Sequence, residues 1–407
     1  MPIVNDRILT VNAGSSTVKF AVFETAGFRA DDPASDPPGA ALRGAIDGIG
    51  AAPRLTARDR DGKTVIDKSW PADAGHGTED FLEELLRWVE SDPVDRLVAA
   101  GHRIVHGGPD FTGPVLVDDA ILRALDALCP LAPLHQPQNL APIRALRKLR
   151  PNLPQVASFD TAFHRTMPPV ATRLALPRAF ADQGIRRYGF HGLSYAYIAG
   201  SLARHDPALA AGRVVVAHLG NGASLCALRA GKSVDTTMSF TALDGLVMGT
   251  RSGAIDPGVL LYLLQAKGLT PADLEDLLYH RSGLLGVSGI ASDMRKLQES
   301  DDPAAEEAID LFVFHAAREI AAMAASLGGL DGIVFTAGIG EHSPEIRRRI
   351  SDRAAWLGIR FDPSANASGG PRLSTADSPV GVWVIPTNEE AMLARHTLDV
   401  LAEIQAA

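Results

Sequence analysis

Two turns of small polar residues follow apolar stretches of this sequence. Arg7–Val11 leads into Asn12-Ala-Gly-Ser-Ser-Thr17, and Arg213–Leu219 leads into Gly220-Asn-Gly-Ala-Ser224. Backbone N–H groups that glycine leaves accessible bind phosphate oxygens well, and neighbouring Ser and Thr hydroxyls add further donors. Both turns therefore predict contact with phosphate groups.

The best-known phosphate motifs are nevertheless missing. Gly231-Lys232-Ser233 and Gly62-Lys63-Thr64 have the last residues of a P-loop, but Cys226 and Ala57 stand where its first glycine is required. Gly338-Ile-Gly340 follows an apolar run but lacks the third glycine of a dinucleotide-binding motif. Nucleotide contact and a tight packing turn both remain open for this glycine-rich turn.

The elements that must position these turns follow from apolar periodicity. It predicts strands at residues 7–11, 18–24, 96–101, 156–159, 213–219, 225–229, 332–336 and 383–385. Helices are predicted at 78–90, 118–129 and 303–326, from 343 onward and in a last segment reaching about 406, and residues 30–41 read as a Pro- and Asp-rich loop.

A strand, a small polar turn and a second strand occur at Asn12 and again at Asn221, about half the chain later. This weak repeat predicts two related α/β halves that face each other across a cleft. In open α/β sheets, ligands bind beyond the strand ends, where these turns lie. We expect one domain to comprise residues 1–160 plus 389–407 and the other to comprise residues 161–388.

The composition excludes several classes of function. With 407 residues, of which 46% are apolar, the chain can build a large core without metal or disulfide support. A net charge of −9 and only 6% aromatic residues argue against nucleic acid and a basic membrane anchor. Cys129 and Cys226 lack zinc or redox spacing, and the N-terminus lacks a signal sequence, so we expect a cytoplasmic protein with reduced thiols.

Eight segments spread in order through the chain form its most specific pattern. They are 11–20 (VNAGSSTVKF), 101–108 (GHRIVHGG), 159–164 (FDTAFH), 187–192 (RYGFHG), 218–222 (HLGNG), 248–253 (MGTRSG), 335–341 (FTAGIGE) and 386–390 (PTNEE). Together they resemble the acetate kinase family over residues 7 to about 395. The resemblance implies an α/β fold of two duplicated actin-like (RNase H-like) ATPase domains facing an active-site cleft.

The resemblance also implies reversible phosphoryl transfer from ATP to acetate, with Mg²⁺ or Mn²⁺ as the metal, in a homodimer. A carboxylate acceptor is already ionised and needs no general base, but its charge and that of the phosphoryl must be neutralised. The positions that the resemblance assigns to catalysis suit that chemistry. They are Arg103, Asp160, His191 and Arg251, with His191 and Arg251 stabilising the transition state. The resemblance links Mg²⁺ to Asn12 and Glu389, and also to Asp160.

Two binding surfaces are implied in the same way. The acyl group would contact Arg103, Val105, Leu134, Phe190 and Ala242, and His135 would lie near the active site. ATP would contact Asn12, Ser15, Thr17, Lys19, His218, Leu219, Gly220, Asn221, Gly222, Asp293, Met294, Arg295, Gly338, Ile339, Gly340 and His342.

The chain departs from the family pattern at four places. Gln136-Pro-Gln138 replaces an Asn-Pro turn, Gly192-Leu-Ser-Tyr195 replaces Gly-Thr-Ser-His, and His342 replaces an asparagine on the adenine side. Ala242 stands where the family has a proline in the acyl pocket. Because alanine removes carbon volume there, we hypothesise that propionate is accepted better than in a proline-lined pocket.

Other functions and structural roles remain open from the residues alone. A sugar kinase of the same fold would use Asp160 as the base for a hydroxyl, and a non-enzymatic nucleotide-binding protein would leave the arginines unexplained. Asp160 could instead cap a turn, and Glu389 could complement a helix dipole. His102 and His106 are four residues apart, but a strand-to-loop segment argues against zinc binding.

Overall fold

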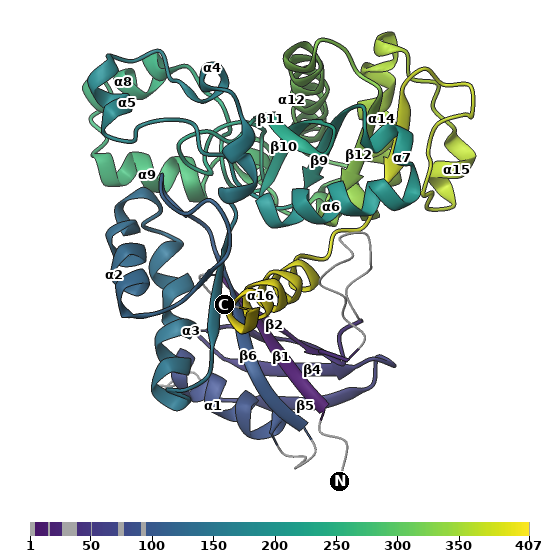
Figure 1. The fold of residues 1–407 in the computed structure, drawn as a ribbon. Coiled ribbons are helices and arrows are strands. Elements are labelled where there is room, and N and C mark those ends of the chain that lie inside the picture. Colours follow the sequence, from purple (N-terminus) through teal and green to yellow (C-terminus); the bar gives the residue numbers. More distant parts are fainter. Residues whose placement is uncertain are drawn as a thin grey trace. The chain divides into compact units, whose positions relative to one another are not determined.

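A computed structural model describes residues 5–14, 17–26, 39–49, 51–71, 77–90 and 95–406. The chain divides into two compact units (Figure 1). Unit 1 takes residues 1–163, 192–197 and 388–407, and unit 2 takes residues 164–191 and 198–387. The sequence-based domain boundaries at residues 160 and 388 stay a prediction.

Unit 1 is built on an eight-stranded sheet with the order β5-β4-β3-β2-β1-β6-β8-β7. Strands β5 to β1 are antiparallel to their neighbours, whereas β1, β6 and β8 run parallel. The strands are β1 (Asn5–Ala13), β2 (Thr17–Glu24), β3 (Leu42–Asp47), β4 (Arg54–Asp59), β5 (Thr64–Ser69), β6 (Asp95–Ile104), β7 (Val115–Leu116) and β8 (Gln155–Phe159).

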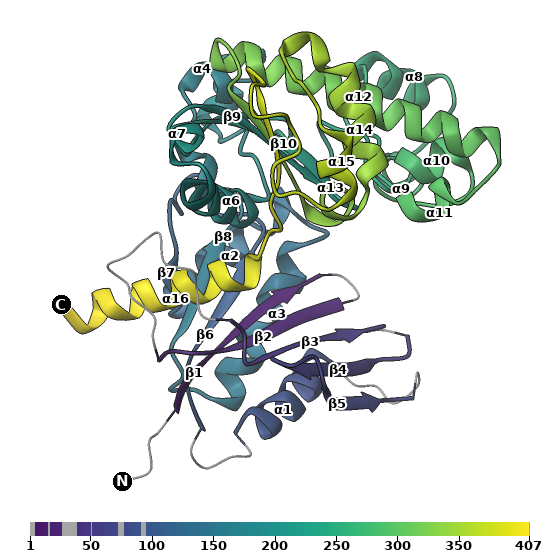
Figure 2. The ribbon, with the colours of Figure 1, turned by 90° about the vertical axis from the view of Figure 1, so that its right-hand side faces the viewer.

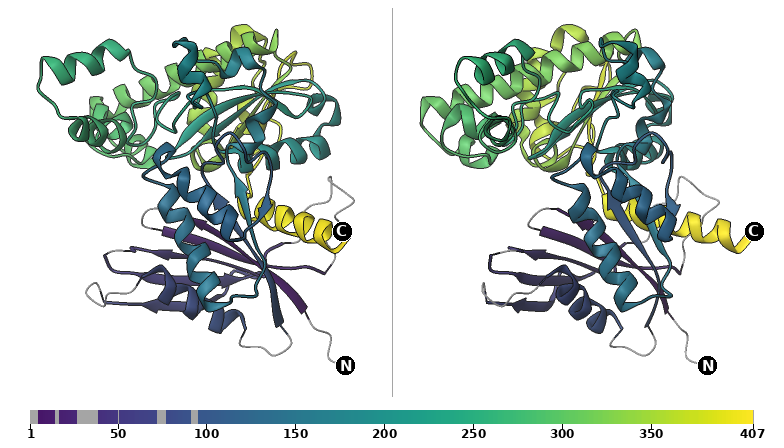
Figure 3. Two further views of the ribbon diagram at one scale, coloured as in Figure 1. Left: turned by 60° about the vertical axis from the view of Figure 1, so that its left-hand side comes forward. Right: turned by 90° about the vertical axis from the view of Figure 1, so that its left-hand side faces the viewer.

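Helices cover both faces of this sheet. Helix α1 (Thr78–Val89) presents Phe81, Leu82 and Leu85 at helical spacing, and they pack in one buried cluster with Leu9 of β1. The last helix, α16 (Glu389–Ala406), packs on the other face, where Ala391 joins a cluster formed with β2 residues. Figures 2 and 3 show α16, in yellow, running alongside the strands of unit 1. The other helices are α2 (Asp119–Ala127), the 3-10 helix η1 (Cys129–Leu131) and α3 (Gln136–Leu149).

Unit 2 contains a five-stranded sheet with the order β11-β10-β9-β12-β13. The strands are β9 (Arg213–Leu219), β10 (Ala223–Arg229), β11 (Lys232–Thr236), β12 (Gly332–Thr336) and β13 (Gly381–Val384). The 25-residue helix α12 (Pro303–Leu327) packs against β9, β10 and β11 with a stripe of buried residues that includes Ile309, Val313 and Ile320. Its apolar residues therefore serve packing.

Shorter helices surround the sheet of unit 2. They are α4 (Pro169–Thr172), α5 (Arg178–Asp182), α7 (Pro207–Ala210), α8 (Pro257–Gln265), α9 (Pro271–His280), α10 (Gly283–Ser288), α11 (Met294–Gln298), α13 (Ala337–His342), α14 (Pro344–Arg353), η3 (Ala355–Leu357) and α15 (Pro363–Ala367). Two further elements, η2 (Ala162–Thr166) and α6 (Gly192–His205), have residues in both units.

The two sheets share one topology. In unit 1 the strands β3-β2-β1-β6-β8 repeat the order of β11-β10-β9-β12-β13 in unit 2, with three antiparallel strands followed by two parallel ones. The turns at Asn12 and Asn221 connect equivalent strands. The predicted α/β class and the internal repeat are therefore confirmed.

The predicted strands and helices are present. Strands β3, β4, β5, β7 and β11 were not predicted, nor were helices α3 and α6 and most of the shorter helices. Gly62 and Gly231 lie in hairpin turns rather than in P-loops. The predicted turn at Gly338–Gly340 is wrong, because these residues lie in helix α13. Most of the predicted loop at 30–41 falls outside the described residues. No helix in the described part of the chain is both long and apolar enough to cross a membrane.

Candidate functional site

Four polar side chains of unit 1 form a continuous chain of contacts. The Arg103 guanidinium donates to Asp160 through Nη2, which lies 2.6 Å from Oδ2, and through Nε, 3.1 Å from both carboxylate oxygens. Its Nη1 donates to Asn12 Oδ1 at 3.0 Å. The Asn12 amide donates in turn to Glu389 Oε2 at 3.4 Å. Residues from β1, β6, the end of β8 and the start of α16 thus meet in one network.

The charge of Arg103 is held firmly in this network. Burial disfavours the cation, but the carboxylates of Asp160, Glu389 and Glu390 outweigh that effect and raise the pKa of Arg103 above its ordinary value. A guanidinium has five N–H donors. The bonds to Asp160 and Asn12 leave one N–H on each terminal nitrogen, so Arg103 retains two donors for an anionic ligand.

Asp160 is almost fully buried, with 1% of its side chain exposed, and both of its oxygens accept bonds from Arg103. Its backbone N–H donates to Ile104 O at 3.1 Å. The structure therefore favours Asp160 as the group that orients Arg103 over Asp160 as a direct metal ligand.

The predicted metal ligands Asn12 and Glu389 are hydrogen-bonded to each other. Glu389 is half-buried at the first residue of α16, so its carboxylate also faces the positive end of the helix dipole. Among the described residues, no three His, Cys, Asp or Glu side chains are grouped for metal binding. A carboxylate and an amide oxygen fit Mg²⁺, which commonly takes one or two carboxylates and completes its shell with water and phosphate oxygens.

The remaining predicted residues of unit 1 have more varied positions. Val105 is buried, and its N–H donates to Asn139 Oδ1 at 2.8 Å. Leu134 and His135 are half-buried just before α3. The Thr17 hydroxyl donates to Asp47 at 3.1 Å, the side chain of Lys19 is exposed, and Ser15 lies outside the described residues.

In unit 2, His191 is held between a serine and a second histidine. Its Nδ1 lies 2.8 Å from Ser224 Oγ, and its ring stacks on His218 with 4.2 Å between the ring centroids. Ser224 is fully buried in β10, opposite His218 of β9. His191 itself has φ 59, a left-handed conformation that is uncommon for a residue with a Cβ. Strain of this kind is found frequently at functional sites.

His191 and Arg251 meet at Gly222. A methyl group added to Gly222 would lie 3.4 Å from His191 Nε2 and 3.8 Å from Arg251 Nη1, so both cation-capable groups face this residue of the predicted phosphate turn. Arg251 Nη1 donates to the carbonyl of Ala242 at 3.2 Å. The backbone of Ala242 thus positions Arg251, and Phe190, which precedes His191, is buried.

The turn Gly220–Gly222 is compact. The Gly220 N–H donates to Gly222 O at 3.1 Å, and the Gly249 N–H donates to Asn221 O at 3.0 Å. A Cβ on Gly249 would lie only 1.9 Å from Asn221 Oδ1, so glycine is required for the close approach of these two segments. Because Leu219 and Ala223 on either side are buried, the turn alone projects from the sheet.

A cavity of about 540 Å³ opens beside this turn in unit 2. It is bounded by the turn itself, by the start of α11 and by α13. Eight residues predicted to bind ATP line it: Gly220, Asn221, Asp293, Met294, Arg295, Gly338, Ile339 and His342. Asp293 caps α11 and pairs with Arg295 at 3.0 Å, which lowers the pKa of Asp293 below its ordinary value.

Helix α13 is fixed at both ends, which explains why its glycines form a helix rather than a turn. The Glu341 carboxylate accepts from the backbone N–H groups of Ala337 at 2.8 Å and Thr387 at 3.0 Å. At the other end, the buried Arg347 donates to the carbonyls of Gly340 and Glu341 at 2.9 and 2.7 Å. Gly338 thereby faces the cavity from a rigid helical turn.

Several residues of the site were not predicted. Ser292, Gln298 and Ser343 also line the nucleotide-sized cavity. Asn139 links β6 to the phosphate turn of β1, because it accepts from Val105 N and donates to Ala13 O at 2.6 Å. Ser224 could have been predicted as a site residue, because it directly follows the second glycine turn. Nothing in the sequence around Ser292, Gln298, Ser343 or Asn139 indicates that these residues belong to the site.

His102 and His106 do not form a metal site with each other. Burial lowers the pKa of each to about 4, although Gln155 partly offsets the effect at His102. The Nδ1 of His106 accepts from Gly108 N at 2.9 Å. Both histidine side chains are buried, at 1% and 0% exposure.

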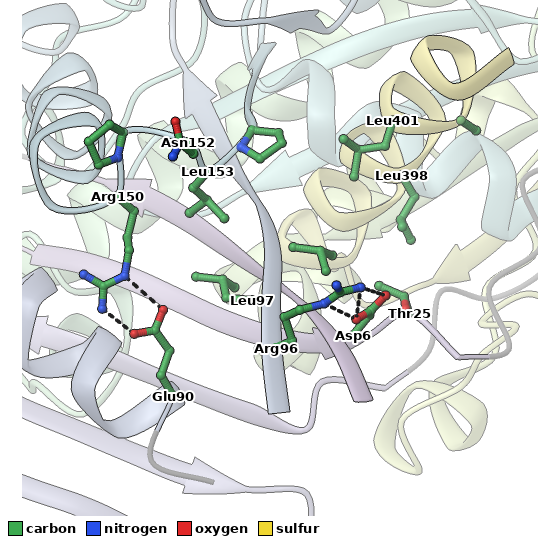
Figure 4. Close-up of a pocket in the computed structure, with 14 residues that line it drawn as sticks. Asp6, Thr25, Glu90, Arg96, Leu97, Arg150, Asn152, Leu153, Leu398 and Leu401 are labelled. Atoms are coloured by element: carbon green, nitrogen blue, oxygen red, sulfur yellow. Dashed lines mark hydrogen bonds and ion pairs between the residues drawn. The ribbon is translucent and has the colours of Figure 1, made fainter. Parts of the chain in front are cut away.

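A further cavity, of about 750 Å³, lies in unit 1 at the ends where β1 and β6 begin (Figure 4). Figure 4 shows Arg96 directed at Asp6, at 2.9 Å, and Arg150 directed at Glu90, at 3.1 Å. Each arginine is therefore neutralised by a carboxylate. None of the predicted site residues lines this cavity.

Comparison with known proteins groups the chain with kinases of short carboxylates. A family model described as the acetokinase family matches residues 7–395. An acetate kinase from Rhodopseudomonas palustris is 54% identical over 397 residues, which cover 97% of this chain and 98% of the relative. Solved structures of an acetate kinase from Porphyromonas gingivalis and a propionate kinase from Francisella tularensis match with TM-scores of 0.86 and 0.88 at 34% and 35% identity, covering 97% of this chain and 100% of each.

The chain belongs to the acetokinase family. The resemblance carried by the eight sequence segments is confirmed. So is the fold class that it implied, two duplicated actin-like α/β domains, because the structural matches extend over nearly the whole chain.

Proposed function

We propose that this protein transfers the γ-phosphoryl group of ATP to acetate, reversibly, forming acetyl phosphate and ADP. A carboxylate oxygen of acetate forms the new bond to phosphorus, and the bond to the bridging oxygen breaks so that its electron pair stays on ADP. The observation that carries this proposal is in unit 2, where a nucleotide-sized cavity opens beside a glycine turn that faces both His191 and Arg251.

Unit 2 supplies the nucleotide site and the groups for the phosphoryl. The adenosine portion occupies the cavity between α11 and α13, and the phosphates lie along Gly220–Gly222. His191 and Arg251 neutralise the charge on the phosphoryl oxygens as transfer proceeds. Ser224 holds Nδ1 of His191, which leaves Nε2 directed toward Gly222.

Unit 1 supplies the cation for the acceptor carboxylate. Arg103 keeps two N–H donors beyond those that bind Asp160 and Asn12, and paired donors of a guanidinium suit a carboxylate. Asp160 fixes the orientation of Arg103 but has no free base function, since both of its oxygens are bonded to that cation. This arrangement argues against a sugar kinase, in which Asp160 would have to take a proton.

Asn12 and Glu389 would hold Mg²⁺ when Mg-ATP binds, together with water and phosphate oxygens. The ion would neutralise the charge of the nucleotide phosphates. The protein itself orients Arg103, holds Glu389 through a hydrogen bond from Asn12 and presents N–H donors at the two turns. Mn²⁺ fits the same oxygen ligands.

The proposal is tested by measuring ADP release with a panel of acceptors at saturating Mg-ATP. We expect rapid ADP release with acetate, with the acyl phosphate trapped as a hydroxamate, and only background release with glucose or without an acceptor. If no short carboxylate gave a hydroxamate, the proposal would be wrong. Release with glucose alone would support the sugar kinase.

Propionate is a second candidate substrate. Ala242 stands in place of a family proline, and the propionate kinase from Francisella tularensis is among the closely matching structures. Because Ala242 binds Arg251 through its carbonyl, its side chain can change without loss of that bond. We expect Ala242→Pro to lower kcat/KM for propionate relative to acetate by about tenfold, the scale of one methylene in an apolar pocket. An unchanged ratio would exclude Ala242 as a determinant.

Two further expectations complete the proposal. The resemblance suggests a homodimer, which light scattering of the purified protein would test. The cytoplasm is the expected location, where acetate and ATP are both available and no nucleic acid or membrane partner is needed.

A further inference from the structure

The segment that joins the motif at residues 159–164 to the motif at residues 187–192 has an unusual charge. Residues 164–187 contain five arginines, at positions 165, 173, 178, 186 and 187, and one acidic residue, Asp182. The chain as a whole carries a net charge of −9, so this concentration of cations is a local exception. None of these five arginines belongs to the candidate active site described above.

Three of the five arginines surround a small cavity. Its volume is about 290 Å³, and it is lined by Arg165, Met167, Pro169, Thr172, Arg173, Ala181 and Arg186. The backbone N–H of Arg187 donates to Thr172 O at 2.8 Å, which brings the end of the segment back to the end of α4. The volume corresponds to roughly ten water molecules, which is enough for a small oxyanion with an organic substituent.

The arginines at this cavity are not neutralised by the protein. Nη1 of Arg165 is buried and has no hydrogen-bond partner among the described residues. Arg186 donates through Nε to the carbonyl of Arg187 at 3.4 Å and lies over the ring of Tyr188. Burial lowers the pKa of Arg186 below its ordinary value, and the nearby positive charge of Arg165 lowers it further.

The cavity in unit 1 provides a comparison, because both of its arginines are neutralised by carboxylates. There Arg96 and Arg150 each bind a carboxylate, Asp6 and Glu90. At the cavity of unit 2, no lining residue is acidic, and no ion pair within the described residues involves Arg165, Arg173 or Arg186. Leaving a buried guanidinium donor unsatisfied costs free energy unless a ligand completes it.

We propose that this cavity is a second anion site that binds a phosphate group, free or as a small phosphate monoester. Guanidinium forks match the oxygens of phosphate, and two adjacent uncompensated cations favour a dianion over a monoanion such as acetate. The site shares no residue with the nucleotide cavity, with Arg103 or with Arg251. The proposal therefore stands whether or not the reaction proposed above is correct.

Isothermal titration with inorganic phosphate at constant ionic strength tests the site. We expect saturable binding to the wild-type protein and at least tenfold weaker binding to Arg165→Gln and to Arg186→Gln. Arg178→Gln is the matched control, because it removes the same charge from the same segment at an exposed position outside the cavity. Its affinity should remain within twofold of wild type.

Further variants separate this site from the catalytic groups and from a folding defect. Arg251→Ala should retain phosphate binding at the arginine cavity, and Arg165→Lys should give intermediate affinity because it keeps the charge but loses the fork. If Arg165→Gln does not fold, the exposed Arg173→Gln serves in its place. Titration with glycerol 3-phosphate distinguishes a free phosphate site from a monoester site by which ligand binds more tightly.

Two results would overturn the proposal. One is the absence of phosphate binding to the wild-type protein at millimolar concentration by either ligand. The other is binding that is lost in Arg251→Ala but unchanged in Arg165→Gln and Arg186→Gln, since phosphate would then occupy the catalytic turn alone.

Discussion

The two sheets share a strand order but carry different groups at corresponding strand ends. Near the end of β1 in unit 1, the side chain of Asn12 joins an ionic network with Arg103 and Glu389. After β9 of unit 2, the equivalent turn is Gly220–Gly222, a glycine turn that faces a histidine and an arginine. The sheet of unit 1 thus has paired charged side chains at this edge. The sheet of unit 2 has backbone N–H donors and a cavity there.

This difference shows how a duplicated scaffold supports two different roles. Parallel strands bring their carboxyl ends to one edge of each sheet, so any residue placed there is available to a ligand. In unit 1, Asp160 follows β8 and fixes Arg103; in unit 2, α13 follows β12 and lines the nucleotide-sized cavity. The topology fixes where function can lie, and the residues after each strand decide which function it is.

The largest loss of activity is expected from removing the guanidinium of Arg251 in unit 2. Arg251→Ala should lower kcat by about a thousandfold, equivalent to about 4 kcal/mol, because the phosphoryl loses a preorganised positive charge. The Tm should change little, since Arg251 is only partly buried. Arg281→Ala, at an exposed ion pair with Asp276, is the control and should retain near-normal kcat. Full activity of Arg251→Ala would remove it from the reaction.

The charge network of unit 1 should respond in stability as well as in rate. Asp160→Asn leaves Arg103 without its buried partner and should lower the free energy of unfolding by about 3 kcal/mol. The control is Asp6→Asn, which breaks the exposed pair with Arg96 and should cost less than about 1 kcal/mol. Chemical denaturation measures both variants, and equal losses would contradict the assigned difference between them.

Acid should destabilise unit 1 more than unit 2. Burial lowers the pKa of three histidines of unit 1, His102, His106 and His396, from 6.5 to about 4. In unit 2, burial lowers the pKa of His164 to about 4 and also lowers the pKa of His315. A histidine with a depressed folded pKa contributes stability above pH 6.5, and that contribution is lost as the pH falls toward 4. At pH 5 the loss is about 2 kcal/mol per histidine.

Hydrogen exchange followed by mass spectrometry at pH 7 and pH 5 measures this difference. After correction for intrinsic exchange rates, protection should fall further in β6, β8 and α16 than in β9 and β12. Equal loss of protection in the two units would contradict the prediction.

A smaller effect is expected at the residue that orients His191. Ser224→Ala should lower kcat by about tenfold, or about 1.4 kcal/mol, with little change in the KM for ATP. Ser233→Ala removes the corresponding bond from Ser233 to His164, which lies at 2.9 Å in the same unit, and should leave kcat unchanged. If both variants lost activity equally, the effect would be one of packing.

The sequence predicted the fold where its signals were local. Buried strands followed by glycine or asparagine turns indicated β1, β9 and β12, and the repeat at Asn12 and Asn221 indicated the duplication. Strands β3 to β5 escaped prediction because their exposed face carries charged residues such as Arg43, Arg58 and Asp67, and small residues such as Ala57 at inward positions give only a weak apolar signal.

The residues of the candidate site could be predicted where the resemblance to the family supplied a motif. The contacts between their side chains could not be predicted. The pairing of Arg103 with Asp160 joins residues 57 positions apart, and the bond of Asn12 to Glu389 joins residues 377 apart. Helix α13 forms because Glu341 and Arg347 cap its two ends, and a single sequence does not show that these side chains meet. Such contacts arise only from tertiary folding.

The direct test of the central claim is phosphorus NMR of the purified protein with Mg-ATP and acetate. We expect ADP and acetyl phosphate to appear in equal amounts, and ATP to form again when those two products are supplied instead. ADP accumulating with inorganic phosphate and no acetyl phosphate, at every acetate concentration, would contradict the account.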